Sequence, residues 1–264
     1  MSPASARGLE GRHVVVTGAG TGIGRAIAER LAAEGAHLTL LARGVPRLEE
    51  TAQSIGGTVQ VAECDIRDRG AVDRAFDAAV KAHGPLYALV ANSGIGGANE
   101  AGQADRFDDL VATNLTGTYS CMRAAERHLA ESGPEGQEAR HLVAISSILG
   151  RIGVGGYTGY CASKAGILGL VRALAAELAP LQVQVNGVCP GWVDTAMAHE
   201  GLEGMAEGIG ISKDAAYRMA MQQVPLGRMS APKDVAGMVA WLLSPDARGV
   251  TGQALDMNGG AFML

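Results

Sequence analysis

The sequence predicts an α/β fold in which a doubly wound parallel sheet carries helices on both faces. Strand-like and helix-like segments alternate along all 264 residues, which is the pattern of successive βα units. Apolar residues make up 47% of the chain but aromatic residues only 4%, so the core is mostly aliphatic, as in strands buried on both faces. No internal boundary or short repeat marks a second domain, so we expect residues 1–264 to form one domain.

Short runs of β-branched and aliphatic residues mark the strands. The first run, at 13–16, leads directly into a glycine-rich turn. The expected strands are 13–16, 37–42, 58–63, 86–91, 141–145, 182–188 and 253–257.

Apolar residues at helical spacing mark the helices between these strands. Ile23, Ile27 and Leu31 recur on one face, and Gly35 ends that helix. Pro46 begins the next helix, because proline is favoured in a first turn. The expected helices are 22–34, 46–55, 69–82, 104–130, 160–179 and 232–243. The glycine- and methionine-rich segment 190–225 has no clear assignment.

Composition excludes several classes of function. The net charge is −5 and no basic stretch could neutralise phosphates, so we expect no nucleic-acid partner. No apolar run reaches the length of a membrane span, and the N-terminus lacks the apolar core of a signal peptide. The widely separated cysteines form no C-x-x-C, which predicts buried reduced thiols in a cytoplasmic protein and no metal site. These cysteines are Cys64, Cys121, Cys161 and Cys189.

A glycine-rich turn, T-G-A-G-T-G-I-G at 17–24, follows the first strand and opens the first helix. Gly18 would permit the tight turn, Gly22 would let the backbone approach a pyrophosphate, and Gly24 would let the helix pack closely on the strand. The helix N-terminus adds N–H donors and the positive end of a dipole. The turn predicts a Rossmann-like dinucleotide site, with an ordinary βα turn as the alternative, because the spacing of its first two glycines departs from G-x-G-x-x-G.

The end of the second strand bears on which nicotinamide cofactor binds. L-L-A-R at 40–43 offers no carboxylate to hold a ribose 2′-hydroxyl. Arg43 could pair instead with a 2′-phosphate through its planar fork, which favours NADP(H) over NAD(H). Stacking on adenine or exposure to solvent is the alternative for Arg43. Asp65, after the third strand, is placed to meet the adenine edge, and capping of the following helix is its alternative role.

Tyr160 and Lys164 lie four residues apart, so a helix puts both on one face. A tyrosine is a poor acid at neutral pH, and a nearby ammonium should lower its pKa. Ser147 lies at the end of the fifth strand, where its hydroxyl could bind a substrate oxygen as charge develops there. We therefore predict that Tyr160 donates a proton to a carbonyl that receives hydride from a nicotinamide. Tyr157 has Cys161 four positions on and no lysine, so it is expected to be a pocket wall.

Together these motifs make the chain resemble the short-chain dehydrogenase/reductase family, from about residue 11 to the C-terminus. The shared motifs are T-G-x-x-x-G-x-G at 17–24, Y-x-x-x-K at 160–164 with a serine at 147, and P-G-x-V-x-T at 190–195. The resemblance implies a nicotinamide-dependent oxidoreductase that acts on CH–OH or C=O groups.

The resemblance also assigns roles to further residues. Asn114, in T-N-L, would distort its helix, hold a water near Lys164, and complete a catalytic tetrad with Ser147 and Tyr160. Tyr160 and Lys164 would in addition contact the cofactor, Lys164 at the nicotinamide ribose. Other cofactor contacts are expected at Thr17, Gly18, Gly22, Ile23, Gly24, Ile66, Asn92, Gly94, Pro190, Gly191, Val193 and Thr195.

Substrate specificity is expected to reside in the segment 190–225. Its glycines supply mobility and its methionines an adaptable apolar surface, which suggests a lid. Two amphipathic helices packed on the domain edge are the alternative. No basic cluster for an acidic substrate stands out, although Arg151 is one possible cation, so a neutral ketone or an acyl thioester fits best. The candidate pocket residues are Ile95, Ile148, Tyr157, Trp192 and Met197.

The stretches C-P-G-W-V-D-T-A-M and V-P-L-G-R are similar to those of bacterial ketoacyl and polyketide-type ketoreductases, and also to those of alcohol and hydroxyacyl-CoA dehydrogenases. Arg43, the absence of a carboxylate at Ala42 and the full tetrad favour an NADPH-dependent carbonyl reductase. The alternatives are an NAD-dependent secondary-alcohol or hydroxyacyl-CoA dehydrogenase and, in another class, a non-catalytic dinucleotide-sensing protein.

The family resemblance implies a homotetramer that assembles through 104–130, 160–179 and the tail 259–264. Small residues would allow close approach of helices between subunits, or they pack only within the monomer. These residues are Ala162, Ala165, Gly166 and Gly169.

Overall fold

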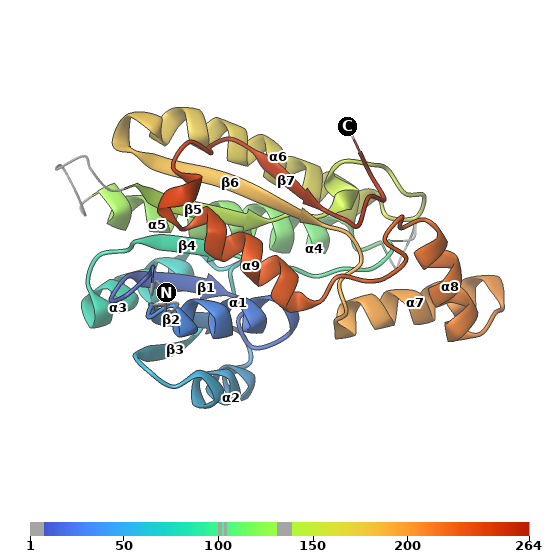
Figure 1. The fold of residues 1–264 in the computed structure, drawn as a ribbon, viewed down its shortest axis with the longest axis horizontal. Coiled ribbons are helices and arrows are strands. Elements are labelled where there is room, and N and C mark those ends of the chain that lie inside the picture. The colour runs from blue at the N-terminus through green and yellow to red at the C-terminus, as the bar shows by residue number, and fades with distance from the viewer. Residues whose placement is uncertain (1–7, 100–101, 103–104, 131–138, 264) are drawn as a thin grey trace, which may run out of the picture.

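The computed structural model describes residues 8–99, 102, 105–130 and 139–263. It confirms a single α/β domain built on a seven-stranded parallel sheet with the order β3-β2-β1-β4-β5-β6-β7 (Figure 1). The strand order reverses between β1 and β4, which is the point where such sheets bind ligands. The strands are β1 His13–Thr17, β2 His37–Ala42, β3 Val59–Glu63, β4 Ala88–Ala91, β5 Arg140–Ile145, β6 Val183–Pro190 and β7 Ala254–Met257.

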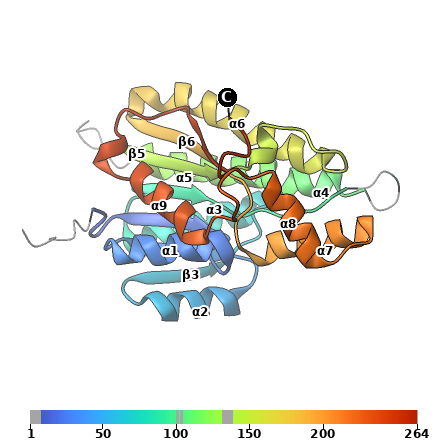
Figure 2. The same ribbon diagram turned by 45° about the vertical axis from the view of Figure 1, so that its right-hand side comes forward.

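Helices cover both faces of the sheet (Figures 1 and 2). On one face lie α1 Gly22–Ala33, α2 Val45–Ile55 and α9 Pro232–Leu242, and on the other lie α3 Arg69–His83, α5 Thr118–Ala130 and α6 Thr158–Leu178. Val14 and Val16 of β1 belong to the first core and Val15 to the second. Both faces of the central strands are therefore buried, as their unbroken apolar runs predict.

The helix expected over 104–130 is interrupted. It begins as α4 Phe107–Val111, passes through a π-helical segment at Ala112–Gly117 and continues as α5. Residue 104, its expected start, lies outside the described residues. Asn114 lies inside the π-helical segment, so the helix is distorted where the family resemblance implies.

The unassigned segment 190–225 contains two helices, α7 Ala196–Ile209 and α8 Lys213–Gln222, which extend from the carboxyl end of the sheet as an arm (Figures 1 and 2). The arm has a small apolar core of its own, which packs against Trp192. This core contains Leu202, Ala220, Met221, Val224 and Met229. Two helices on the domain edge are thus what the structure shows, and closing of the arm stays a prediction.

Three single turns of 3₁₀ helix complete the secondary structure of the described chain. They are η2 Ile148–Gly150, η3 Ala179–Leu181 and η4 Pro245–Ala247. Among the helices of the described segments, none is long and apolar enough to cross a membrane.

The turn between β1 and α1 packs too closely for side chains. Gly18 has a φ of 67°, in the left-handed region that suits glycine. A Cβ on Gly24 would lie 2.2 Å from the Gly18 carbonyl oxygen and 2.4 Å from Asn92 Nδ2. Gly24 therefore lets the first turn of α1 rest on the end of β1, as the sequence predicts.

We predict that Gly24→Ala destabilises the protein by about 1–3 kcal/mol or more, because the new methyl group would meet backbone atoms that cannot rotate away. Gly204→Ala is the matched control, since Gly204 lies within α7 with nothing within 4 Å of an added Cβ. That substitution should be neutral or stabilise by roughly 0.5–1 kcal/mol. Urea denaturation of the two variants measures both effects, and equal stability would contradict the packing argument.

Two buried histidines lie at the opposite end of the sheet from the glycine turn. His13 Nδ1 donates to the Gly84 carbonyl at 2.9 Å, and its Nε2 lies 3.0 Å from the Thr39 hydroxyl. His141 Nε2 lies 3.1 Å from the Tyr87 hydroxyl, which itself donates to the Leu243 carbonyl. Burial lowers the pKa of each histidine from 6.5 to about 4. Both side chains are therefore neutral in the folded protein at neutral pH.

We predict that these histidines make folding acid-sensitive. Their folded pKa values lie below the unfolded value, so the unfolded state binds more protons and stability falls as pH drops from about 6.5 toward about 4. Each histidine should lower the free energy of unfolding by roughly 2 kcal/mol between pH 7 and pH 5. Denaturant unfolding at pH 7 and 5 measures this loss, and His141→Gln should show a smaller one. A free energy of unfolding that is the same at both pH values would refute the prediction.

Candidate active site

The predicted site residues meet at the carboxyl edge of the sheet. The parallel pairing of β1, β4, β5 and β6 places the residues that follow each strand beside one another. The glycine turn follows β1, residues 92–95 follow β4, Ser147 follows β5 and Gly191 follows β6. The topology alone therefore brings the glycine turn and the Ser–Tyr–Lys residues to one edge.

Asn92 and Thr17 join the ends of β1 and β4. The Thr17 hydroxyl accepts from the backbone N–H groups of Asn92 and Ser93, both at 3.0 Å. Asn92 Nδ2 donates to the carbonyls of Thr17 at 3.0 Å and of Gly18 at 3.2 Å. Both residues, predicted as cofactor contacts, thus use their side chains to hold the shape of the glycine turn.

The N-terminus of α1 offers uncapped backbone donors. Its N-cap residue, Thr21, makes no side-chain capping hydrogen bond. A Cβ on Gly22 would lie 3.2 Å from Cγ2 of Thr195, so the start of α7 lies against this turn. The Thr195 hydroxyl caps α7 through the Ala198 N–H at 3.3 Å. Two helix N-termini thus meet where a pyrophosphate is predicted, and free N–H groups and positive dipole ends fit that group.

Two further predicted cofactor contacts, Val193 and Gly191, lie in the segment that connects β6 to α7. Val193 is buried and pairs with Ser230 in an isolated β-bridge. A Cβ on Gly191 would lie 2.9 Å from Cα of Asn258. This segment is therefore held by Ser230 at Val193 and by Asn258 at Gly191, which gives the backbone at 190–195 a defined position.

At the end of β2, Arg43 is exposed and directly follows the strand. Asp65 does not cap α3, because Asp68 does so by accepting from the Ala71 N–H at 3.1 Å. The capping alternative for Asp65 is therefore wrong.

The Asp65 carboxylate is instead bound by Arg67, whose Nη2 donates to Oδ2 at 2.7 Å and whose Nε donates to Oδ1 at 3.1 Å. The Arg67 hydrogen bond lowers the pKa of Asp65, and Arg43 contributes to the same shift. Ile66 is buried and lies against Gly117, where a Cβ would come within 2.6 Å of Ile66 Cδ1. Its side chain therefore packs on the π-helical segment, not toward solvent.

The structure brings Ser147, Tyr160 and Lys164 together. The Ser147 hydroxyl accepts from the Leu149 N–H at 3.1 Å and lies close enough to the Tyr160 hydroxyl to influence its pKa. Lys164 Nζ lies 5.6 Å from the centre of the Tyr160 ring and donates to the Ile145 carbonyl at 2.9 Å. Helix α6 supplies the tyrosine and the lysine, and the end of β5 supplies the serine and the carbonyl.

The pKa of Tyr160 differs from the sequence expectation. Burial raises it, and the Ser147 hydrogen bond, not the lysine, opposes that shift. Burial also lowers the pKa of Lys164 to about 8. The expected lowering of the Tyr160 pKa by the ammonium is therefore wrong, because burial of the phenol sets the direction of the shift and Nζ is directed at the Ile145 carbonyl.

Asn114 lies next to the lysine and is fully buried. Its Oδ1 accepts from the Ile95 N–H at 2.8 Å, and its Nδ2 donates to the Ile95 carbonyl at 3.0 Å and to Ser163 Oγ at 3.1 Å. Ser163 in turn donates to the Tyr160 carbonyl at 2.9 Å. A Cβ on Gly94 would lie 3.1 Å from Asn114 Oδ1 and 3.4 Å from Lys164 Nζ. Asn114 thus holds the loop after β4 against the helix that carries the tyrosine.

The predicted substrate residues lie around this centre with different degrees of exposure. Ile148 is buried and Met197 is 46% exposed. Met197 places its sulfur 2.9 Å from the Cβ position of Gly96, so α7 touches the loop after β4. Trp192 packs against Gly201 of α7 and belongs to the base of the arm. Ile95 is fixed through its backbone by Asn114, and Tyr157 is half-buried at the start of α6.

Arg151 does not offer a free cation to a substrate. Its guanidinium binds the Asp256 carboxylate at 3.2 Å and donates to the Ala254 carbonyl at 2.5 Å. Arg151, which directly follows η2, therefore joins this turn to β7. The basic residue named from the sequence as a possible cation for an acidic substrate is already paired.

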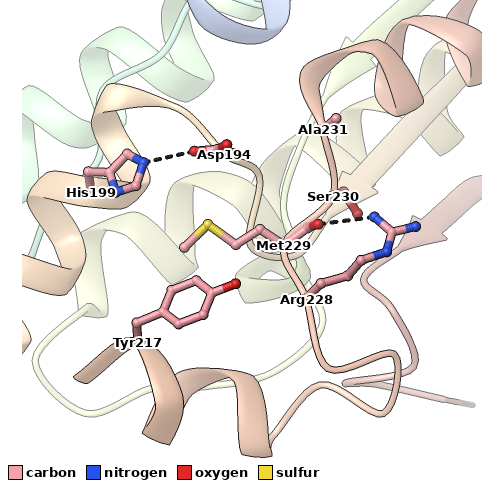
Figure 3. Close-up of a pocket in the computed structure, with 7 residues that line it drawn as sticks. All are labelled: Asp194, His199, Tyr217, Arg228, Met229, Ser230 and Ala231. Atoms are coloured by element: carbon pink, nitrogen blue, oxygen red, sulfur yellow. Dashed lines mark hydrogen bonds and ion pairs between the residues drawn. The ribbon is translucent and has the colours of Figure 1, made fainter. Parts of the chain in front are cut away.

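Sequence reasoning missed a pocket of about 240 Å³ at the base of the arm (Figure 3). Within it, His199 Nε2 lies 2.7 Å from Asp194 Oδ1, while Tyr217 and Arg228 come from other elements (Figure 3). No sequence motif predicts this cavity, because the residues that line it come from three separate segments of the chain. They are Asp194, His199, Tyr217, Arg228, Met229, Ser230 and Ala231. In the described part of the chain, no group of three or more His, Cys, Asp or Glu side chains could hold a metal ion.

Comparisons with known proteins agree with this geometry. Residues 18–261 match a family model described as enoyl-(acyl carrier protein) reductase. The chain is similar to the 3-oxoacyl-[acyl-carrier-protein] reductase MabA of Mycobacterium tuberculosis, at 34% identity over 96% of this chain and 93% of that protein. It is also similar to the 3-oxoacyl-[acyl-carrier-protein] reductase FabG of Escherichia coli, at 31% identity over 97% and 99% of the two chains.

A solved structure of an actinorhodin polyketide ketoreductase variant with NADPH superimposes with a TM-score of 0.89. The two sequences are 35% identical, and the match covers 95% of this chain and 97% of the other. With the glycine turn, the Ser–Tyr–Lys arrangement and these relatives in agreement, the chain belongs to the short-chain dehydrogenase/reductase family.

Proposed function

We propose that this protein is an NADPH-dependent reductase that converts the ketone of an acyl thioester or polyketide-type substrate to an alcohol. The observation that carries the proposal is the placement of the Tyr160 side chain between Ser147, whose hydroxyl influences its pKa, and the buried ammonium of Lys164, 5.6 Å from the centre of its ring. Two neighbouring hydroxyls can both bind a single carbonyl oxygen. The relatives named for reduction of oxoacyl and polyketide ketones support the same chemistry.

The cofactor would lie across the carboxyl edge between β1 and β4. Backbone N–H groups of the glycine turn, with Gly22, Ile23 and Gly24, would bind its pyrophosphate at the start of α1. Gly94, Pro190, Gly191, Val193 and Thr195 would line the nicotinamide side, together with Lys164. When bound, NADPH supplies the hydride.

On the adenine side, the 2′-phosphate would meet Arg43. No carboxylate stands at Ala42 to repel it, and the Arg43 side chain is exposed. Asp65 is neutralised by Arg67, so it presents less net negative charge to a phosphate than a free carboxylate would. The crystallised relative with NADPH supports this preference.

Tyr160 would donate the proton to the developing alkoxide while Ser147 hydrogen-bonds the same oxygen. Burial raises the pKa of Tyr160, so its hydroxyl is protonated at neutral pH and ready to donate. Burial lowers the pKa of Lys164 to about 8, so its ammonium is mostly charged below that pH and stabilises the tyrosinate that the transfer leaves. Asn114 would hold Ile95 and a water beside the lysine and so complete the tetrad.

The substrate would be neutral at its reacting end. Arg151 is paired with Asp256, and Ile95, Ile148, Tyr157, Trp192 and Met197 offer mostly apolar surface. The arm of α7 and α8 would act as the lid, since Met197 already touches the loop after β4. The family model is described by an enoyl reduction, but paired hydroxyls from Ser147 and Tyr160 suit a carbonyl oxygen better than a carbon–carbon double bond.

The alternatives have less support. An NAD-dependent alcohol or hydroxyacyl-CoA dehydrogenase would use the same tetrad but leaves Arg43 without a role. A non-catalytic sensor does not need the intact Ser–Tyr–Lys set, and the named relatives are reductases.

We further infer a homotetramer in the cytoplasm. Ala162 and Ala165 are exposed on α6, and a Cβ on Gly169 would meet nothing within 4 Å, so this face is open to another subunit. Gly166 instead packs within the monomer, where a Cβ would come 2.7 Å from Leu115.

We predict that Tyr160→Phe lowers kcat by at least about 100-fold, because the proton donor is removed while the ring remains. NADPH affinity should change by less than about threefold, since the hydroxyl contributes little to the cofactor cradle. Ketone-dependent loss of NADPH absorbance measures the first effect and fluorescence titration the second. Turnover near that of the wild type would overturn the role of Tyr160.

We predict that Arg43→Asp shifts the preference from NADPH toward NADH. The new carboxylate would repel a 2′-phosphate and could hold a 2′-hydroxyl, so the ratio of kcat/KM values for NADPH and NADH should fall by at least about tenfold. Arg47→Asp, on the exposed start of α2, is a control for the change in charge. If both variants shift the ratio equally, the change reflects general electrostatics and Arg43 has no specific role.

A further inference from the structure

Asn99 lies in the loop after β4, yet its side chain reaches the start of α6, the helix that carries Tyr160 and Lys164. Its Oδ1 accepts from the backbone N–H of Gly159 at 2.8 Å, sixty residues further along the chain. The Thr158 hydroxyl lies 2.9 Å from its Nδ2 and 3.1 Å from its Oδ1. The Asn99 N–H donates to the Gly156 carbonyl at 2.9 Å. The side chain of Asn99 is thus bound to the first turn of α6, and its backbone to the turn that precedes this helix.

Helix α6 has no cap from its own sequence. Its N-cap residue, Tyr157, makes no side-chain capping hydrogen bond, and the first N–H groups of a helix have no partner within it. A cap normally accepts from the second or third N–H group of the helix. Gly159 is the second residue of α6, so Asn99 supplies from a distant loop the acceptor that a local serine or aspartate would usually supply.

The same loop is attached to the active site at a second point. Asn114 binds the N–H and the carbonyl of Ile95, and through Ser163 it reaches the Tyr160 carbonyl. On its other side, Asn99 Nδ2 donates to the Asp105 carboxylate at 3.2 Å. Asp105 in turn accepts from the Phe107 N–H at 2.9 Å, at the start of α4.

Tight packing explains why the cap comes from outside α6. A Cβ on Gly159 would lie 3.0 Å from Leu110 Cδ1 and 3.1 Å from Phe107 Cα. Helix α4 therefore lies directly over the first turn of α6, and Asn99 supplies an acceptor for the Gly159 N–H beside this contact. Gly159 precedes Tyr160 directly, so a shift of this turn would move the proton donor.

We propose that Asn99 is a positioning residue that caps α6 from the loop after β4 and so fixes Tyr160 relative to the substrate side of the site. The catalytic consequence rests on the proposed reductase function, whereas the capping itself does not. The loop that carries Ile95, a substrate-pocket residue, and the helix that carries the proton donor are thereby held as one unit.

The test compares three variants of the full-length protein. Asn99→Ala removes the cap and should lower kcat for ketone reduction by about tenfold, with KM for NADPH changed by less than about twofold. Amide hydrogen exchange in the first turn of α6, at 158–162, should become about tenfold faster in this variant. The exchange measurement needs no substrate, so it reports on the cap even if the proposed reaction is wrong.

Asp105→Ala is the control for a general loosening of the loop and of the start of α4, because it removes the carboxylate that binds Asn99 Nδ2 and the Phe107 N–H and leaves the bond from the Gly159 N–H to Asn99 in place. It should keep kcat within about twofold of the wild type and leave exchange at 158–162 unchanged. The double variant N99D/D105N exchanges the two side chains. The carboxylate at position 99 can accept from the Gly159 N–H, and the amide at position 105 can donate to that carboxylate. The double variant should recover kcat to within about threefold of the wild type.

Each outcome decides the matter. Unchanged exchange at 158–162 in Asn99→Ala would overturn the capping role, and an equal loss of kcat in Asp105→Ala would assign the effect to the loop alone. Faster exchange with an unchanged kcat in an active enzyme would overturn the positioning role. A wild-type protein that reduces no ketone would instead refute the proposed function, and the exchange data would still test the cap.

Discussion

The buried ammonium of Lys164 is the constraint on which the rest of the site depends. A charged group that is 4% exposed must be paired or hydrogen-bonded, since removal from water is costly. Nζ finds the Ile145 carbonyl at the end of β5, and Ser146 holds the backbone of the same lysine through its carbonyl at 2.8 Å. Gly94 leaves room beside Nζ where a side chain would intrude. The lysine thus fixes the spacing between α6, β5 and the loop after β4.

A second set of close contacts fixes the cofactor half of the site. The Asn92 amide donates to the carbonyls of Thr17 and Gly18 in the glycine-rich turn. Gly24 lets the start of α1 contact the same glycine-rich turn. The consequence is that α1 and the end of β4 cannot move independently. Because β4 also leads into the loop bound by Asn114, the cofactor half and the proton-transfer half share one rigid edge of the sheet.

The sequence predicts most of this architecture because it depends on local signals. Alternating apolar segments predict every strand to within about two residues, and T-G-x-x-x-G-x-G and Y-x-x-x-K predict both halves of the site. The sequence does not predict which side chains pair when tertiary packing decides it. Asp65 pairs with Arg67, only two residues away, but Arg151 pairs with Asp256, which lies on the distant strand β7. The π-helical turn and the cap from Asn99 likewise depend on how α4 meets α6, which periodicity does not encode.

The opposed pKa shifts of Tyr160 and Lys164 bear on the direction of catalysis. Desolvation disfavours charge on both groups, raising the pKa of the phenol and lowering that of the ammonium. A tyrosine that stays protonated is a ready donor to an alkoxide but a reluctant base toward an alcohol at neutral pH. Once the proton has left, the tyrosinate and the ammonium attract each other in the same dry environment that penalised each alone. Tyr160 is therefore in the protonation state from which a proton can be delivered to a carbonyl oxygen, as carbonyl reduction requires.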